Sequence, residues 1–191
     1  MNIQLSQLVE QVRGCNHCAA SLPFGSRPVV QVSSTAKLLI ASQAPGSKVH
    51  ASGIPFNDAS GDRLRDWTGL SKDQFYDMDR VAILPMAFCY PGRAAGGDAP
   101  PRTECAPLWR KRLLALMPSI QLTLLVGGYA HQAELGSGKV HDRVRGYRNY
   151  LPHYFPLPHP SWRSQIWMNN NPWFEREVLP ELQTRVAVLA E

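Results

Sequence analysis

The chain has 191 residues, of which 44% are hydrophobic and 18% are charged, and this balance excludes a wholly disordered protein. The length favours one domain, which we expect to span residues 1–191. The net charge is +5, from 20 Lys and Arg against 15 Asp and Glu, and it permits a nucleic-acid partner without requiring one. No apolar run approaches the roughly 18 residues of a membrane span, and the start has no secretory pattern, so we expect a cytoplasmic protein.

Apolar periodicity and the positions of Gly and Pro divide the chain into alternating helices and strands. In chain order the pattern predicts a helix over 3–13, a loop over 19–35, a strand over 37–42, a helix over 60–69, a strand over 80–88, a loop over 90–103, a helix over 104–117, a strand over 121–127, a helix from 129, a strand-like stretch at 154–155 and a closing helix over 172–190. Pro85 cannot donate to a ladder, so the second strand should end near Leu84. Pro180 should break or kink the last helix.

This alternation predicts an α/β fold with a largely parallel sheet. In such sheets ligands bind beyond the carboxyl ends of the strands. Three segments fall there, namely 43–58, 85–103 and 157–163. We therefore expect the functional residues to come from these segments.

The four cysteines are Cys15, Cys18, Cys89 and Cys105, and together they indicate a metal centre. A Cys-x-x-Cys pair in a reducing compartment favours metal or redox chemistry over a structural disulfide. Four thiolates suit either an iron–sulfur cluster or tetrahedral zinc, and the presence of one close pair instead of two favours the cluster. The alternative is four unrelated buried cysteines.

Six motifs occur in a characteristic order along the chain: Cys15-x-x-Cys18, Ser42-Gln43-Ala44-Pro45-Gly46, Gly53-Ile54-Pro55-Phe56, Cys89, Glu104-Cys105 and His159-Pro160-Ser161. As a set they resemble the uracil-DNA glycosylase superfamily, most closely its cluster-bearing branch, family 4, over roughly residues 10–165. The resemblance implies a three-layer α/β/α sandwich with a central, mostly parallel four-stranded sheet. It also implies a structural [4Fe–4S] cluster on the four cysteines, with Zn²⁺ as the alternative metal.

The implied activity is hydrolysis of the N-glycosidic bond of uracil, or of another deaminated or damaged base, in base excision repair. Such an enzyme holds an extruded base in a pocket. Phe56 would stack on that base, and backbone groups from Gln43 through Ala44 to Gly46 would face the base or a water molecule. His159 would stabilise the charge on the departing base. Each residue also has a purely structural alternative: Phe56 as a core aromatic residue, residues 43–46 as an ordinary Pro-Gly turn, and His159 as a buried, hydrogen-bonded histidine.

The implied partner is DNA with a damaged or deaminated base, bound by a monomer. Ser161, Arg163 and Arg102 are placed to contact phosphates or the minor groove. Further basic and aromatic residues are interleaved in the same parts of the chain, namely Arg93, Arg145, Tyr147, Arg148, Tyr150 and Trp162.

Three positions depart from the family 4 pattern. Gln43 stands where that branch usually has Glu, and His50 stands where it often has Asp; either side chain would position the attacking water. Pro85, at a base-binding position, takes the place of the Asn that reads uracil. The identity of the excised base therefore does not follow from the resemblance. The loop from Arg93 to Gly97 lacks the His-bearing insertion of a related branch, so we expect no covalent adduct. The alternative function is a non-catalytic iron–sulfur protein of the same fold that binds nucleic acid.

Overall fold

The structure, a computed structural model, describes residues 2–190. Its centre is a parallel sheet in the order β2-β1-β5-β6. The strands are β1 (Leu38–Ala41), β2 (Val81–Ile83), β5 (Leu122–Val126) and β6 (Tyr154–Leu157). In the ladder Leu39 pairs with Ala82 on one side and with Thr123 on the other. The predicted α/β class with a four-stranded, largely parallel sheet is confirmed.

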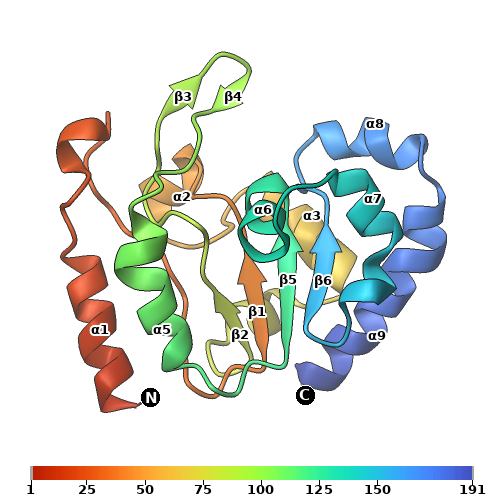
Figure 1. The fold of residues 1–191 in the computed structure, drawn as a ribbon, viewed down its shortest axis with the longest axis horizontal. Coiled ribbons are helices and arrows are strands. Elements are labelled where there is room, and N and C mark those ends of the chain that lie inside the picture. The colour runs from red at the N-terminus through yellow and green to blue at the C-terminus, as the bar shows by residue number, and fades with distance from the viewer. Residues whose placement is uncertain (1, 191) are drawn as a thin grey trace.

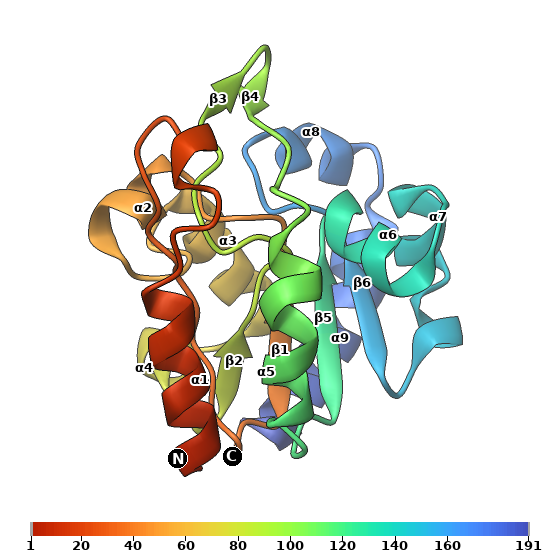
Figure 2. The same cartoon turned by 60° about the vertical axis from the view of Figure 1, so that its left-hand side comes forward.

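Alternation along the strands builds a hydrophobic core on each face of the sheet. Leu38 and Ile40 pack with helices α3 (Ala59–Thr68) and α9 (Leu179–Leu189) on one face. Leu39 packs on the other face with helices α1 (Ile3–Arg13) and α5 (Lys111–Ala115), and α6 (Gly128–Leu135) packs beside them against the neighbouring Ala41. Successive strand residues point to opposite faces, so four-residue apolar strands can supply both cores. The result is the three-layer arrangement of Figures 1 and 2, where α1 and α5 stand in front of the sheet in the second view.

Short elements that the sequence pattern did not reveal complete the fold. They are the helices α2 (Ser47–Ser52), α4 (Lys72–Tyr76), α7 (Val140–Arg145) and α8 (Arg163–Asn169), the 3₁₀ turns η1 (Ala19–Ser21) and η3 (Tyr147–Tyr150), and the hairpin of β3 (Arg93–Ala94) and β4 (Gly97–Asp98). Figure 1 shows that the hairpin and α8 rise above the carboxyl ends of the strands. No helix within residues 2–190 is both long enough and apolar enough to cross a membrane.

Two predicted helices differ from the observed ones. The segment expected as one helix over 104–117 opens with a π-helical turn, η2 (Ala106–Arg110), before α5. The closing helix likewise begins with a π-helical turn, η4 (Phe174–Val178), which leads directly into α9. Pro180 lies in the first turn of α9, where the π-helical turn gives way to α-helix, so the helix changes type near the proline and continues beyond it.

Candidate active site at the carboxyl edge of the sheet

A pocket of about 90 Å³ opens where β1, β2 and β6 end. This is several times the roughly 10–15 Å³ that one water molecule needs. Its lining residues are Val29, Ser42, Ala44, Pro45, Gly46, Val49, Pro55, Phe56, Asp58, Ser60, Ile83, Pro85, Asp98 and His159. The structure thus brings five of the predicted residues to one cavity: Ala44, Gly46, Phe56, Pro85 and His159.

Phe56 forms part of one pocket wall in a strained backbone conformation. Its φ of 52° lies in the left-handed region, which bulky side chains rarely adopt. Gly61 permits this turn, because a Cβ there would lie 1.7 Å from the carbonyl oxygen of Phe56. The hydroxyl of Tyr76 donates to the carbonyl of Pro55 at 3.0 Å, and the ring of Phe75 meets Phe56 edge-on. Strain that the surroundings enforce in this way is typical of functional sites.

His159 follows β6 and reaches the mouth of the same pocket. It packs on the backbone of Gly127. A Cβ added to Gly127 would lie 3.2 Å from the Cβ of His159. Although part of the side chain is open to solvent, the protein packed around it lowers the pKa of His159 below its ordinary value. The carboxylates of Asp58 and Asp98 act in the opposite direction. The lowered pKa favours a neutral imidazole, which carries one N–H donor.

Asp58 and Asp98 are pocket residues that the sequence analysis missed. Asp58 caps α3, and its Oδ1 accepts a hydrogen bond from the Gly61 N–H at 2.9 Å. Asp98 ends strand β4, and its Oδ1 accepts from the Tyr90 hydroxyl at 3.3 Å. An Asp directly before a helical pattern signals a cap, so Asp58 could have been placed from sequence as a cap, but not as a pocket residue.

Gln43 and His50 do not line this pocket. Gln43 lies in the adjoining groove, and its amide nitrogen donates to the Ala99 carbonyl at 3.3 Å. His50 sits on α2, with its ring centroid 6.1 Å from that of Phe24 and 6.0 Å from that of Tyr90. His50, which we expected to position water, therefore packs in an aromatic cluster with Phe24 and Tyr90.

The groove beside the pocket shares Ala44, Pro45, Ser60, Asp98 and His159 with it. Its other lining residues include Arg93 of the hairpin and three consecutive residues at the start of α8, Ser161, Trp162 and Arg163. An Arg163 N–H donates to the Gly96 carbonyl at 2.7 Å, which ties α8 to the hairpin. Trp162 is 69% exposed. The predicted DNA contacts Ser161 and Arg163 therefore lie beside the pocket mouth.

Most of the chain, residues 29–183, matches the model of the uracil DNA glycosylase superfamily. The chain belongs to this superfamily. The matched segment contains every residue that lines the pocket and the groove, as well as Cys89 and Cys105. Cys15 and Cys18 precede it.

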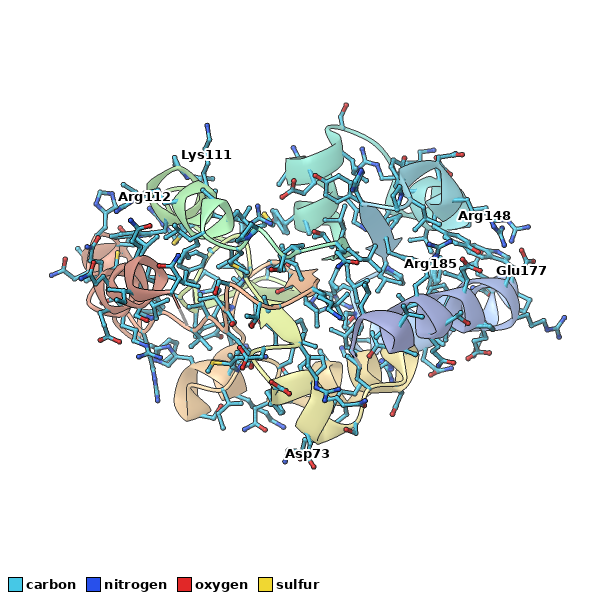
Figure 3. All side chains as sticks on the ribbon, turned by 90° about the horizontal axis from the view of Figure 1, so that it is seen from below. Asp73, Lys111, Arg112, Arg148, Glu177 and Arg185 are labelled. Carbon is cyan, nitrogen blue, oxygen red and sulfur yellow. The ribbon has the colours of Figure 1, made fainter. Side chains whose placement is uncertain are left out.

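Other basic residues of this glycosylase-family chain lie away from the groove. Arg145 pairs with Glu177 at 3.2 Å and stacks on Trp173, and Arg148 covers the ring of Tyr147. Figure 3 places Arg148 at the outer edge of the molecule, near Glu177 and Arg185. Arg145 and Arg148 therefore contact aromatic and acidic neighbours and do not line the groove that contains Arg93 and Arg163.

The four cysteines line one small cavity between α1 and the loop before α5. All four thiols are free, and the indole N–H of Trp109 donates to the Cys15 Sγ at 3.3 Å. Arg102 also lines this cavity and pairs with Glu104, so the expected DNA contact is absent from the groove. Burial, with a smaller contribution from the other three cysteines, raises the pKa of the Cys89 thiol to about 11. Within residues 2–190 no set of His, Cys, Asp or Glu side chains converges as ligands of a single metal ion.

Proposed function

We propose that this member of the uracil DNA glycosylase superfamily is a monofunctional DNA N-glycosylase. The observation that carries the proposal is one pocket that combines an aromatic wall, an imidazole and two carboxylates. The pocket opens beside a groove that carries Arg93 and Arg163. A base extruded from DNA needs such a cavity, and its phosphates need such a groove.

In the reaction the bond between C1′ of the deoxyribose and the base nitrogen breaks, and both electrons go to the base. The oxygen of a water molecule bonds to C1′ and loses a proton. Phe56 holds the base by stacking, because its ring forms a pocket wall. The N–H of a neutral His159 donates to the base as electrons move onto it.

The attacking water belongs at the junction of the pocket and the groove. Asp98 borders both spaces, and Gln43 lies next to it through its hydrogen bond to Ala99. A carboxylate at this junction accepts a hydrogen bond from the water and faces the positive charge that develops on the sugar. His50 has no part in this step, since its ring packs on Phe24 and Tyr90.

Base release from oligonucleotides tests the proposal. Each oligonucleotide carries one deaminated or damaged base, and abasic sites are detected by alkaline cleavage while the freed base is identified by chromatography. We expect release of at least one base. DNA binding without release of any base would contradict the proposal and favour the non-catalytic alternative.

We infer further that Cys15, Cys18, Cys89 and Cys105 hold a [4Fe–4S] cluster. The four residues fit such a group because their side chains surround one cavity, with the Trp109 N–H on one sulfur. Four cysteine thiolates are the usual ligands of a [4Fe–4S] cluster, with one tetrahedral zinc ion as the alternative. The cluster would hold three distant segments together, and no step of the base-release chemistry depends on it.

A further inference from the structure

Two carboxylate oxygens in the pocket lack a donor among residues 2–190. A Cβ added to Gly46 would lie 3.5 Å from Oδ2 of Asp98 and 3.7 Å from Oδ2 of Asp58, so both oxygens face Gly46. The Oδ1 atoms are already occupied by the Tyr90 hydroxyl and the Gly61 N–H. Within residues 2–190, neither Oδ2 atom accepts a hydrogen bond, and both remain available to a ligand.

A hydroxyl that lines the same pocket also has no hydrogen-bond partner among residues 2–190. Ser42 ends the segment after β1, is 6% exposed and lines the pocket. Its hydroxyl forms no hydrogen bond with any residue from 2 to 190, although its carbonyl accepts from the Met86 N–H. The oxygen is open to the pocket, so it can exchange a hydrogen bond with a ligand bound there.

The pocket offers few side-chain donors to the carbonyl oxygens of uracil. Pro85 carries none, no lining side chain in the described part of the chain is Lys, Arg, Asn or Gln, and the donors are the His159 imidazole and the hydroxyls of Ser42 and Ser60. Uracil would bring two carbonyl oxygens and a single ring N–H to a wall that holds two carboxylates. It would also leave as an anion in that negative environment.

We propose that the pocket selects a cationic, amino-bearing base, such as a purine alkylated on a ring nitrogen, over uracil. This inference rests on the proposed glycosylase function and specifies its substrate class. Asp58 Oδ2 and the Ser42 hydroxyl accept the N–H groups of the base edge. The two carboxylates favour its positive charge, which distinguishes the alkylated base from the neutral bases of intact DNA.

The charge balance of the reaction agrees with this choice. When the bond to C1′ breaks, both electrons enter the ring and cancel its positive charge, so the base leaves neutral. The water oxygen bonds to C1′ and its proton passes to solvent. No anion has to be stabilised in the pocket, and the charge that develops on the sugar lies next to Asp98.

The experiment compares an oligonucleotide carrying one 7-methylguanine, methylated DNA that contains 3-methyladenine, and an oligonucleotide carrying one uracil. Base release is measured for the parent, Asp58→Asn, Ser42→Ala and Asp73→Asn. Asn caps a helix about as well as Asp, so Asp58→Asn should keep α3 intact, which thermal unfolding checks. Asp73 is the control, because Figure 3 shows it on the outer surface.

We expect the parent to release a methylated purine at least about 10-fold faster than uracil. Asp58→Asn should slow that release about 10- to 100-fold, the range expected for losing a hydrogen bond to a charged group, without slowing uracil release. Ser42→Ala should act in the same direction, and Asp73→Asn should match the parent. Faster release of uracil by the parent would overturn the substrate inference and leave the glycosylase function standing.

If no base is released from any DNA, the proposed function fails. Binding of free nucleosides then tests the preference for a cationic base separately. Calorimetry would compare 1-methyl-2′-deoxyadenosine, which carries a positive charge, with 2′-deoxyuridine. Tighter binding of the cation, lost in Asp58→Asn, would support the acceptor-rich pocket. Equal binding, or a preference for deoxyuridine, would contradict it.

Discussion

At the scale of single residues, His159 provides the most direct test of the chemistry. Its side chain lines both the pocket and the adjoining groove, and a neutral imidazole offers no positive charge to a phosphate. Loss of one preorganised donor costs on the order of 100- to 1000-fold in rate, so base release should fall by that amount. DNA affinity should stay close to that of the parent. Single-turnover release and fluorescence anisotropy measure the two quantities, and the exposed His153→Ala serves as control.

Gly127 positions His159, and Gly127→Ala should reduce base release without removing a reactive group. The φ of Gly127 is +85°, and a new Cβ would lie 3.2 Å from the Cβ of His159. Gly136 is a matched control, because its φ is +78° but a Cβ there would meet no atom within 4 Å. Their ψ values are 170° at Gly127 and −156° at Gly136, a region that almost only Gly adopts at positive φ, so both variants should lose about 1–3 kcal/mol of stability. Only Gly127→Ala should also slow release; equal rates in the two variants would contradict the positioning role.

The residues that sequence reasoning located differ in kind from those it missed. Phe56 and His159 belong to motifs, and the topology of a parallel sheet brings such motifs to one edge. Asp98 reaches the pocket because it lies on the short hairpin of β3 and β4 at that edge. No local sequence pattern predicts this hairpin. His50 was expected in the site, but α2 directs its ring toward Phe24 and Tyr90 instead.

At the scale of elements, buried strands were predictable and the hairpin was not. The β1 and β5 segments are short apolar runs with both faces buried, and only strands of a covered parallel sheet require that composition. The β3 and β4 strands have two exposed residues each, so no apolar period marks them. A long-range contact, from Arg163 to Gly96, helps to fix the hairpin, and sequence patterns do not reveal such contacts.

The hairpin and α8 together should carry the salt dependence of DNA binding. Arg93 and Trp162 both line the groove, whereas Arg148 does not line it and lies over the ring of Tyr147. If Arg93 contacts a phosphate, Arg93→Ala should reduce the slope of log affinity against log salt by about 1. Arg148→Ala should leave the slope unchanged. Binding titrations between low and moderate salt measure it, and an equal change in both variants would exclude the groove as the main phosphate contact.

At the scale of the whole molecule, a buried histidine links stability to pH. His131 of α6 is 0% exposed, and its Nε2 lies 2.9 Å from the Leu125 carbonyl and 3.0 Å from the Leu157 carbonyl. Burial lowers the pKa of His131, so the unfolded chain binds more protons than the folded chain once the pH falls below the ordinary value of about 6.5. The stability of the folded state should therefore fall as pH drops through this range and stay level above it.

Urea unfolding at several pH values measures this dependence. Each titrating group contributes at most about 1.4 kcal/mol per pH unit. His159, whose pKa is also lowered, contributes in the same direction. His131→Gln should flatten the profile between pH 5 and 7, whereas the exposed His153→Ala should keep the slope of the parent. An unchanged slope in His131→Gln would rule out His131 as its source.

A metal centre in the cysteine cavity should hold together loop segments that lie outside the central sheet. Cys15 and Cys18 follow α1, Cys89 lies beyond β2, and Cys105 precedes η2, so one metal centre would close two long loops. Because metal binding to such ligands is coupled to folding, Cys105→Ser should lose the metal and open the segments 19–35 and 89–105 to proteolysis together. Trp109→Phe should keep the metal and shift its absorption, since it removes only the N–H to Cys15. We expect the parent protein to be brown, and iron and sulfide analysis tests the cluster. Zinc in place of iron would correct the metal, and the absence of both metals would refute the site.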